Sequence, residues 1–231
     1  MIQISNLSKK YGETVVFSDL NYTFENACIY GFVGRNGAGK TTLLNILSNY
    51  DKNYTGVISI DRKKMNKVDY LDMPVAYAMD QPSFFNELTI YENLLLIASS
   101  RKIKKQEAFD KIERILDGLG LKKYENYSPL ELSKGTMQRL NNACAMIQEE
   151  KITIFDEPFS GLDPVQMKLL ENVIVEFHKK EKGIYIISSH DIECLQNVCD
   201  KCLLLHNGQI REINMEEVDR EEIAKILSEG E

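Results

Sequence analysis

The sequence predicts an α/β protein built on a mostly parallel sheet, and three observations support this prediction. In the last third of the chain, short apolar runs alternate with helical segments, as in parallel strands joined by helices. The run at 28–33 carries no charge, which is typical of a buried central strand, and it leads into a glycine-rich loop and a helix. Three consecutive helical segments interrupt the alternation. We therefore expect a single domain over residues 1–231, with a helical subdomain inserted at about 84–150.

The first eighty residues are predicted to be mostly strands. Ile2, Ile4 and Leu7 begin the first strand. The other predicted elements are strands at 14–17, 20–24, 28–33, 57–60 and 75–79 and a helix at 40–48. We expect an N-terminal antiparallel β subdomain beside the parallel core.

The middle third is predicted to be helical, at 89–100, 105–119 and 136–149. In the second helix, Ala108, Ile112 and Leu119 recur at helical spacing, so this stripe should face the core.

The last third returns to alternating elements. We predict strands at 152–155, 184–188 and 203–205 and helices at 165–180, 192–199 and 216–231. Between the last strand and this final, charged helix, Asn207-Gly208 is a strong signal for a tight hairpin.

Composition excludes several classes of protein. The chain has 28 basic and 35 acidic residues and a formal charge of −7, which disfavours sequence-independent binding to nucleic acid. No apolar stretch approaches the roughly 18 residues that would span a bilayer, and the first eleven residues lack the apolar core of a signal peptide. We expect a cytoplasmic protein that binds no nucleic acid and reaches a membrane through a partner.

The five cysteines include the spacing C-x4-C-x2-C at Cys194, Cys199 and Cys202, as in plant-type ferredoxins, with Cys144 or Cys28 as a conceivable fourth ligand. We interpret all five as reduced thiols. The first two of the spaced cysteines fall on a predicted helix and the third opens an apolar strand, which are ordinary places for small core residues.

Residues 34–41, Gly-Arg-Asn-Gly-Ala-Gly-Lys-Thr, fit the pattern G-x4-G-K-[ST] between a strand and a helix. In such a loop the backbone N–H groups surround phosphates, and the helix N-terminus adds a positive dipole end. We expect Lys40 to reach the β- and γ-phosphates and the Thr41 hydroxyl to bind Mg²⁺. The predicted phosphate-binding residues are Gly34, Asn36, Gly37, Ala38, Gly39, Lys40, Thr41 and Thr42.

Two adjacent acids follow the apolar run at 152–155. The end of such a strand lies at the edge where open α/β sheets bind ligands. We expect Asp156 to hold Mg²⁺ and Glu157 to polarise an attacking water, which favours hydrolysis over binding alone. Without the glycine-rich loop, these acids would more often be solvated residues at a strand end.

With these motifs in this order, the chain resembles the nucleotide-binding subunit of an ATP-binding cassette (ABC) transporter, from about Ile2 to Arg211. The resemblance implies a P-loop NTPase core. It also implies that Tyr11, in Lys-Lys-Tyr-Gly, stacks on adenine, and that Gln81 senses Mg²⁺ and the attacking water. A surface tyrosine at a turn is the alternative for Tyr11.

Residues 132–136, Leu-Ser-Lys-Gly-Thr, are similar to the family signature L-S-G-G-Q, with Lys134 and Thr136 as departures. The resemblance implies that Ser133 and Gly135 bind the γ-phosphate of an ATP molecule held by another subunit. With a lysine at position 134, the signature loop is similar to that of exporter-type cassettes.

Two further residues match family positions. Asp163, in Ser-Gly-Leu-Asp-Pro, matches the residue that crosses the dimer interface, and it is also a good helix N-cap before Pro164. His190 matches the histidine that contacts the γ-phosphate. We expect the remaining histidines, His178 and His206, to lie at the surface.

One motif is interpreted as a decoy. Residues 66–69 spell Asn-Lys-Val-Asp, the N-K-x-D pattern that recognises guanine in GTPases. It lies soon after Lys40 and far before Asp156, whereas in GTPases it follows the Mg²⁺-binding acids. We interpret it as a polar loop.

The resemblance implies an ATPase in which two copies, or this chain and a related cassette, enclose two ATP molecules. The dimer would drive a membrane-spanning permease subunit, with export as the expected direction, from the inner face of the cell membrane. Phe84, Phe85, Leu88 and Tyr91 mark residues 81–93 as the expected docking face; sealing the helical subdomain is the alternative for them. A soluble ABC-type ATPase without a transporter and an ATP-gated regulatory module are the alternative functions, and Glu157 with His190 argues against the second.

Overall fold

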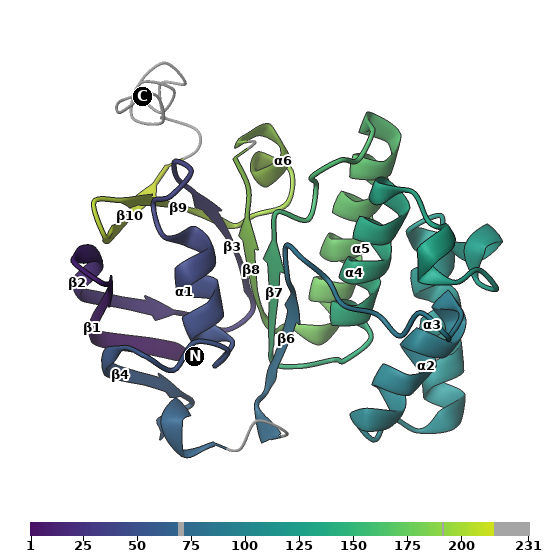
Figure 1. The fold of residues 1–231 in the computed structure, drawn as a ribbon, viewed down its shortest axis with the longest axis horizontal. Coiled ribbons are helices and arrows are strands. Elements are labelled where there is room, and N and C mark those ends of the chain that lie inside the picture. The colour runs from purple at the N-terminus through teal and green to yellow at the C-terminus, as the bar shows by residue number, and fades with distance from the viewer. Residues whose placement is uncertain (69–71, 191, 215–231) are drawn as a thin grey trace.

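The computed structural model describes residues 1–68, 72–190 and 192–214 (Figure 1). The strands are β1 Ile2–Tyr11, β2 Thr14–Phe24, β3 Cys28–Val33, β4 Thr55–Ile60, β5 Lys63–Lys64, β6 Val75–Ala78, β7 Ile152–Asp156, β8 Ile184–Ser188, β9 Lys201–His206 and β10 Gln209–Ile213. The α-helices are α1 Lys40–Leu47, α2 Ile90–Ser100, α3 Lys105–Gly118, α4 Lys134–Met146, α5 Pro164–Glu181 and α6 Ile192–Gln196. The predicted helix at 216–231 and Asp69 of the decoy motif lie outside the described residues.

The larger sheet has the strand order β10-β9-β3-β8-β7-β6 and is parallel except for the β9–β10 pair. Every residue of β3, β7 and β8 is buried, which agrees with their continuous apolar sequences. The predicted hairpin at Asn207-Gly208 is confirmed. Both residues have positive φ, 48° and 71°, as a two-residue turn with the twist of the flanking strands requires.

The smaller sheet is antiparallel, with the order β2-β1-β4-β5, as expected for the N-terminal region. The two strands predicted at 14–17 and 20–24 are one strand, β2. The predicted break corresponds to an irregularity, because Asp19 has a φ of 52° and the register against β1 shifts repeatedly. Helix α1 lies between the two sheets (Figure 1), and its buried Leu43, Leu44 and Ile46 belong to the core that joins them.

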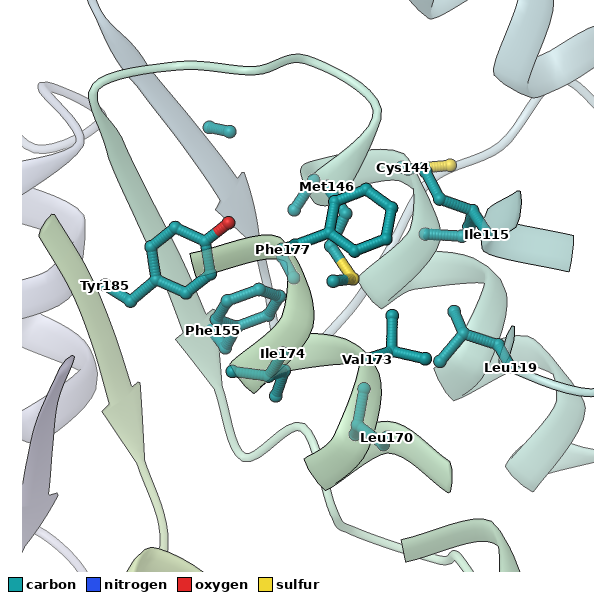
Figure 2. Close-up of a cluster of buried hydrophobic side chains, with 14 of the residues drawn as sticks. Ile115, Leu119, Cys144, Met146, Phe155, Leu170, Val173, Ile174, Phe177 and Tyr185 are labelled. Atoms are coloured by element: carbon teal, nitrogen blue, oxygen red, sulfur yellow. The ribbon is translucent and has the colours of Figure 1, made fainter. Parts of the chain in front are cut away.

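The helices α3, α4 and α5 lie on the other side of the larger sheet (Figure 1). Figure 2 shows their shared core, where Phe155 of β7 and Tyr185 of β8 face Ile174 and Phe177 of α5. Helix α4 begins two residues earlier than predicted, because the Ser133 side chain accepts a hydrogen bond from the Thr136 N–H and caps the helix there.

One buried lysine joins the inserted helices to the rest of the core. Lys111 on α3 is 2% exposed. Its Nζ lies 2.6 Å from a carboxylate oxygen of Glu149 and 3.1 Å from one of Glu181, which ends α5. The Tyr185 hydroxyl donates to the other oxygen of Glu181. A charged network thus spans α3, α5 and β8.

Two details of the sequence-based interpretation are wrong. His178 was expected at the surface but is buried, because its ring packs edge-on against Tyr185 and its Nε2 contacts the Gly183 carbonyl oxygen. Cys199 lies beyond the end of α6 rather than on a helix. All five cysteines are free thiols. None of the described helices is long and apolar enough to cross a membrane.

Candidate active site

The glycine-rich loop connects β3 to α1 and follows the path that its glycines allow. Gly37 and Gly39 have φ values of 80° and 100°, a region that L-residues avoid, and a Cβ on Gly39 would lie 2.7 Å from Val16 Cγ1. Gly39 also occupies the N-cap of α1, so no side chain caps this helix. The first N–H groups of α1 are therefore free of side-chain caps at the site where an anion would bind.

Lys40 folds back into this loop. Its side chain is buried, and its Nζ donates to the Gly34 carbonyl oxygen at 2.6 Å and to that of Arg35 at 3.3 Å. Burial lowers the pKa of the ammonium, while the nearby carboxyl groups of Glu157 and Asp156 favour its charged form. A buried cation held by neutral carbonyls can exchange them for an anionic ligand.

A cavity of about 440 Å³ opens over the loop. It brings together residues from the loop and the start of α1, from β1 and β2, and from the segments that follow β6 and β7. Its walls are Tyr11, Thr14, Val16, Arg35, Asn36, Gly37, Gly39, Lys40, Thr41, Thr42, Asp80 and Glu157. Ala38 lines an adjoining cavity of about 410 Å³, together with Asn36 and Gly37. A Cβ on Gly34 would lie 2.9 Å from the Leu205 carbonyl oxygen, so this glycine permits close packing on β9.

Tyr11 stands at the wall of the first cavity with half of its surface exposed. Its hydroxyl donates to Asp51 Oδ2 at 3.1 Å. The ammonium of Lys9 lies 4.5 Å from the ring centroid and 2.6 Å from the same carboxylate oxygen. Tyr11 is therefore an oriented aromatic ring beside the phosphate loop, which a freely rotating surface tyrosine would not be.

Asp156 ends β7 and is almost completely buried. The Ser188 hydroxyl donates to its Oδ1 at 2.5 Å, and the Tyr77 hydroxyl lies 3.4 Å from its Oδ2. Burial raises the pKa of this carboxyl group, and hydrogen bonds from Ser188 and Thr41 oppose that rise. The Thr41 hydroxyl and the Asp156 carboxylate thus meet beneath the loop.

Glu157 has a backbone φ of 50°, in the left-handed region that non-glycine residues rarely occupy. Its N–H donates to the Ser188 Oγ at 2.9 Å, and its carbonyl accepts from Gln138 Nε2 at 3.2 Å. Its carboxylate Oε2 lies 2.9 Å from the Nδ1 of His190, whose side chain is 71% exposed. Because a carboxylate only accepts hydrogen bonds, this Nδ1 is the donor. The bent backbone therefore directs Glu157 into the cavity wall while Asp156 stays beneath it.

Ser133, Gly135 and Asp163 lie elsewhere. Ser133 and Asp163 line a separate cavity of about 540 Å³, without any residue of the glycine-rich loop. A Cβ on Gly135 would lie 2.8 Å from the Gly161 carbonyl oxygen, so glycine is needed where α4 approaches the 160–163 loop. The predicted N-cap is confirmed, since Asp163 Oδ1 accepts from the Gln166 N–H at 2.9 Å. The structure thus separates the expected site residues into two groups.

Gln81 does not line the cavity over the loop. It is exposed two residues beyond Met79, and its neighbour Asp80 lines the cavity instead. Sequence reasoning also missed the residues that hold the two acids, namely Ser188, Tyr77 and Gln138. Of these, only Ser188 had a usable signal: it ends β8 directly opposite Asp156, at the edge where parallel sheets gather ligands.

Comparison with known proteins identifies the family. Residues 17–160 match the family model of the ABC transporter. The chain belongs to the ABC transporter family. It is 31% identical to an uncharacterised ABC transporter ATP-binding protein of Methanocaldococcus jannaschii, over 90% of this chain and 75% of that protein. It is 30% identical to the tungstate uptake system ATP-binding protein TupC of Peptoclostridium acidaminophilum, over 91% and 97%, and to the bacitracin transport ATP-binding protein BcrA of Enterococcus faecalis, over 95% and 71%.

Solved structures of ABC proteins have the same fold. An ATP-binding subunit of an ABC transporter superimposes with a TM-score of 0.88 at 26% identity, covering 98% of this chain and 99% of that one. A dimeric bacterial ABC transporter cassette gives a TM-score of 0.81 at 23% identity, over 93% and 98%, and supports the fold alone. The expected P-loop NTPase fold is therefore confirmed, and this ABC cassette is an ATPase of the kind that drives transport.

Proposed function

We propose that this ABC cassette hydrolyses ATP with Glu157 as general base, and that hydrolysis powers export through a separate membrane subunit. The observation that carries the catalytic part is the 2.9 Å contact between Glu157 Oε2 and His190 Nδ1. It holds a carboxylate in the wall of the cavity that Lys40 and Thr41 also line. In this position the carboxylate accepts a proton from the attacking water, and His190 contacts the γ-phosphate.

Each end of the nucleotide has a partner in this site. The triphosphate lies against the loop, where Asn36, Gly37, Ala38 and Gly39 contribute backbone N–H groups and Lys40 contributes its charge. Thr42 lines the same cavity, and Tyr11 offers its ring to adenine. The ring and the loop share one cavity, which supports a single bound nucleotide spanning both.

Mg²⁺ fits beside Thr41 and Asp156. Asp156 is buried next to a second acid, Glu157, and burial raises its pKa, so a divalent cation would offset the cost of keeping it ionised. The described residues contain no group of three or more His, Cys, Asp or Glu that could hold a metal. In nucleotide sites Mg²⁺ takes most of its oxygen ligands from phosphates and water. We propose Thr41 and Asp156, which meet beneath the loop, as its protein contacts, and Gln81, which lies outside this cavity, as a third contact on the family resemblance alone. The ion would supply neutralising charge for the phosphates.

Ser133, Gly135 and Asp163 complete the site from a second copy or a related cassette. Ser133 and Asp163 line a cavity separate from the phosphate loop, which supports a role toward a nucleotide on another chain. The domain over residues 1–231 then acts as one unit, and its helical subdomain at about 84–150 presents Ser133 and Gly135 of this second half-site.

We place the membrane subunit on residues 81–93. Phe85 is 60% exposed, and exposed Tyr127 and Leu130 lie near it because the Ser128 hydroxyl donates to the Asn86 carbonyl oxygen. An apolar patch of this kind on the inserted subdomain supports docking. The cassette is then cytoplasmic and peripheral on the inner face of the membrane. Lys134 in the signature loop supports export as the direction.

The docking experiment compares two exposed apolar residues of the same subdomain. Phe85→Asp should abolish co-purification with the co-expressed membrane-spanning permease subunit, because it places a charge in an apolar interface. Leu96→Asp, on α2 and 43% exposed, should leave co-purification intact. Equal recovery with both variants would contradict the docking face.

The direction of transport is tested with inside-out membrane vesicles that contain this complex. They should accumulate a transported probe when ATP is added outside, with tungstate and bacitracin as the first probes. ATP-driven loss of a preloaded probe would contradict export.

A further inference from the structure

The signature loop departs from its family pattern at Thr136, and the structure gives this threonine a specific set of contacts. Thr136 is 4% exposed in the first turn of α4. Its Oγ1 lies 2.9 Å from the Oγ of Ser133, and its backbone N–H donates to the same Ser133 oxygen at 3.3 Å. Ser133 itself is exposed and lines the cavity of the second half-site.

A buried arginine donates a hydrogen bond to the Thr136 hydroxyl oxygen. The guanidinium of Arg139, which is 4% exposed, donates from Nη2 to Thr136 Oγ1 at 3.2 Å. Its other nitrogens are anchored on backbone: Nη1 donates to the Leu119 carbonyl oxygen at 2.7 Å, and Nε to that of Gly135 at 3.4 Å. The arginine therefore cannot swing away from Thr136 without breaking its bonds to the end of α3 and to the first turn of α4.

The distance alone allows either hydroxyl of the Ser133–Thr136 pair to donate, but the surrounding contacts favour one arrangement of the protons. An arginine only donates, so Thr136 Oγ1 accepts from it. The Thr136 proton then needs an acceptor, and among the described residues Ser133 Oγ is the one that Thr136 contacts. With both lone pairs of Ser133 Oγ taken by the Thr136 N–H and O–H, the Ser133 proton is left to point away from the helix.

We propose that Thr136, anchored by Arg139, is a positioning residue that turns Ser133 into a dedicated hydrogen-bond donor for the anionic phosphate of a nucleotide bound to a second chain. The inference rests on the proposed function, in which Ser133 faces that nucleotide. It also gives the replacement of the family's glutamine a physical role, since a threonine is short enough to sit between Arg139 and Ser133 within one helical turn.

The test measures ATP-dependent association of the full chain. All variants are made in the Glu157→Gln background, so that ATP persists, and the dimer dissociation constant is obtained by light scattering at several concentrations. Thr136→Val removes the hydroxyl at nearly constant volume and should weaken association about tenfold or more, the size expected for a hydrogen bond to a charged group. Thr136→Ser keeps the hydroxyl and should stay within about twofold of the parent.

A double-mutant cycle separates positioning from general damage. Ser133→Ala should weaken association at least as much as Thr136→Val, and adding Thr136→Val to Ser133→Ala should change association by less than about twofold. ATP affinity of the separated chains should be the same for Thr136→Val and Thr136→Ser, because the cavity over the glycine-rich loop is a different one.

Each failure has its own meaning. If Ser133→Ala leaves association unchanged, the proposed role of this half-site fails and the inference fails with it. If Ser133→Ala weakens association but Thr136→Val does not, the inference alone is overturned. Two further results would assign Thr136 a packing role and likewise overturn the inference. One is that Thr136→Val and Thr136→Ser weaken association equally. The other is that Thr136→Val weakens association by the same factor whether residue 133 is serine or alanine.

Discussion

Glu157 shows how much of the chemistry depends on the conformation of a single residue. Its left-handed backbone and its neighbour Asp156 place two carboxyl groups of adjacent residues in different surroundings, one buried beside Thr41 and one paired with His190. A residue with negative φ at this position would not leave the strand at the same angle. Ser188 stabilises both acids at once, because its Oγ donates to Asp156 and accepts from the Glu157 N–H.

Replacing Glu157 by glutamine should separate binding from hydrolysis. Glutamine keeps the size of the side chain and can still contact His190 Nδ1, but it cannot accept a proton from water. We expect ATP affinity to change little and kcat to fall about a hundredfold or more. Equilibrium nucleotide binding and steady-state phosphate release measure the two quantities. Turnover close to that of the parent protein would remove Glu157 from this role.

Helix α4 illustrates how one element can serve two sites. Its N-terminus carries Ser133, while amides further along donate to loops of the catalytic core. The donors are Gln138 to the Glu157 carbonyl at 3.2 Å, Asn141 to that of Met79 at 2.7 Å and Asn142 to that of Pro158 at 3.1 Å. These three side chains are buried, so their hydrogen bonds replace water that the loops have lost. The same amides explain why α4 is buried without being strongly apolar.

The attachment of the inserted helices to the core should depend strongly on Lys111. Lys111→Met keeps most of the side-chain volume but leaves Glu149 and Glu181 without their cation, and we expect the free energy of unfolding to fall by about 3 kcal/mol. Lys151→Met is the control, because Lys151 is 71% exposed and pairs at the surface with Asp61, which is itself 42% exposed. Its loss should stay within about 1 kcal/mol. Urea denaturation of both variants measures the difference, and equal losses would show that the buried network adds nothing beyond a surface pair.

The whole molecule presents its expected site residues as two separate halves. Lys40 and Thr41 line one cavity, and Ser133 and Asp163 line another. Each chain also carries a formal charge of −7, which opposes close approach of two copies unless something compensates for it. In the proposed dimer, an ATP molecule bound at one loop would offer its phosphates to the N-terminus of α4 from the other chain.

We therefore expect the protein to be a monomer without nucleotide and a dimer with ATP. The Glu157→Gln variant in Mg²⁺-free ATP should show this most clearly, because the nucleotide is not consumed. Light scattering with and without ATP gives the mass directly. Raising the salt concentration well above 0.15 M, where the Debye length is already about 8 Å, should change the apo state little. A stable dimer that forms regardless of ATP would contradict this arrangement.

Local sequence was sufficient for the parts of this protein that depend on neighbouring residues. The loop at 34–41 is recognisable because its glycines, its lysine and the start of α1 are contiguous, and the hairpin at Asn207-Gly208 depends on two adjacent residues with positive φ. The strands β3, β7 and β8 were predictable because burial on both faces demands continuous apolar runs.

Other features depended on residues that only folding brings together. Ser188 reaches Asp156 across two neighbouring strands, and Gln138 reaches Glu157 from a helix, so neither contact leaves a periodic signal in the chain. His178 is buried because Tyr185 of β8 packs against it, which no local pattern around the histidine indicates. The division of the site into two halves is a tertiary property for the same reason. The motifs in the sequence identify Lys40 and Ser133 as site residues. However, these residues line different cavities because α1 and α4 pack against opposite faces of one sheet.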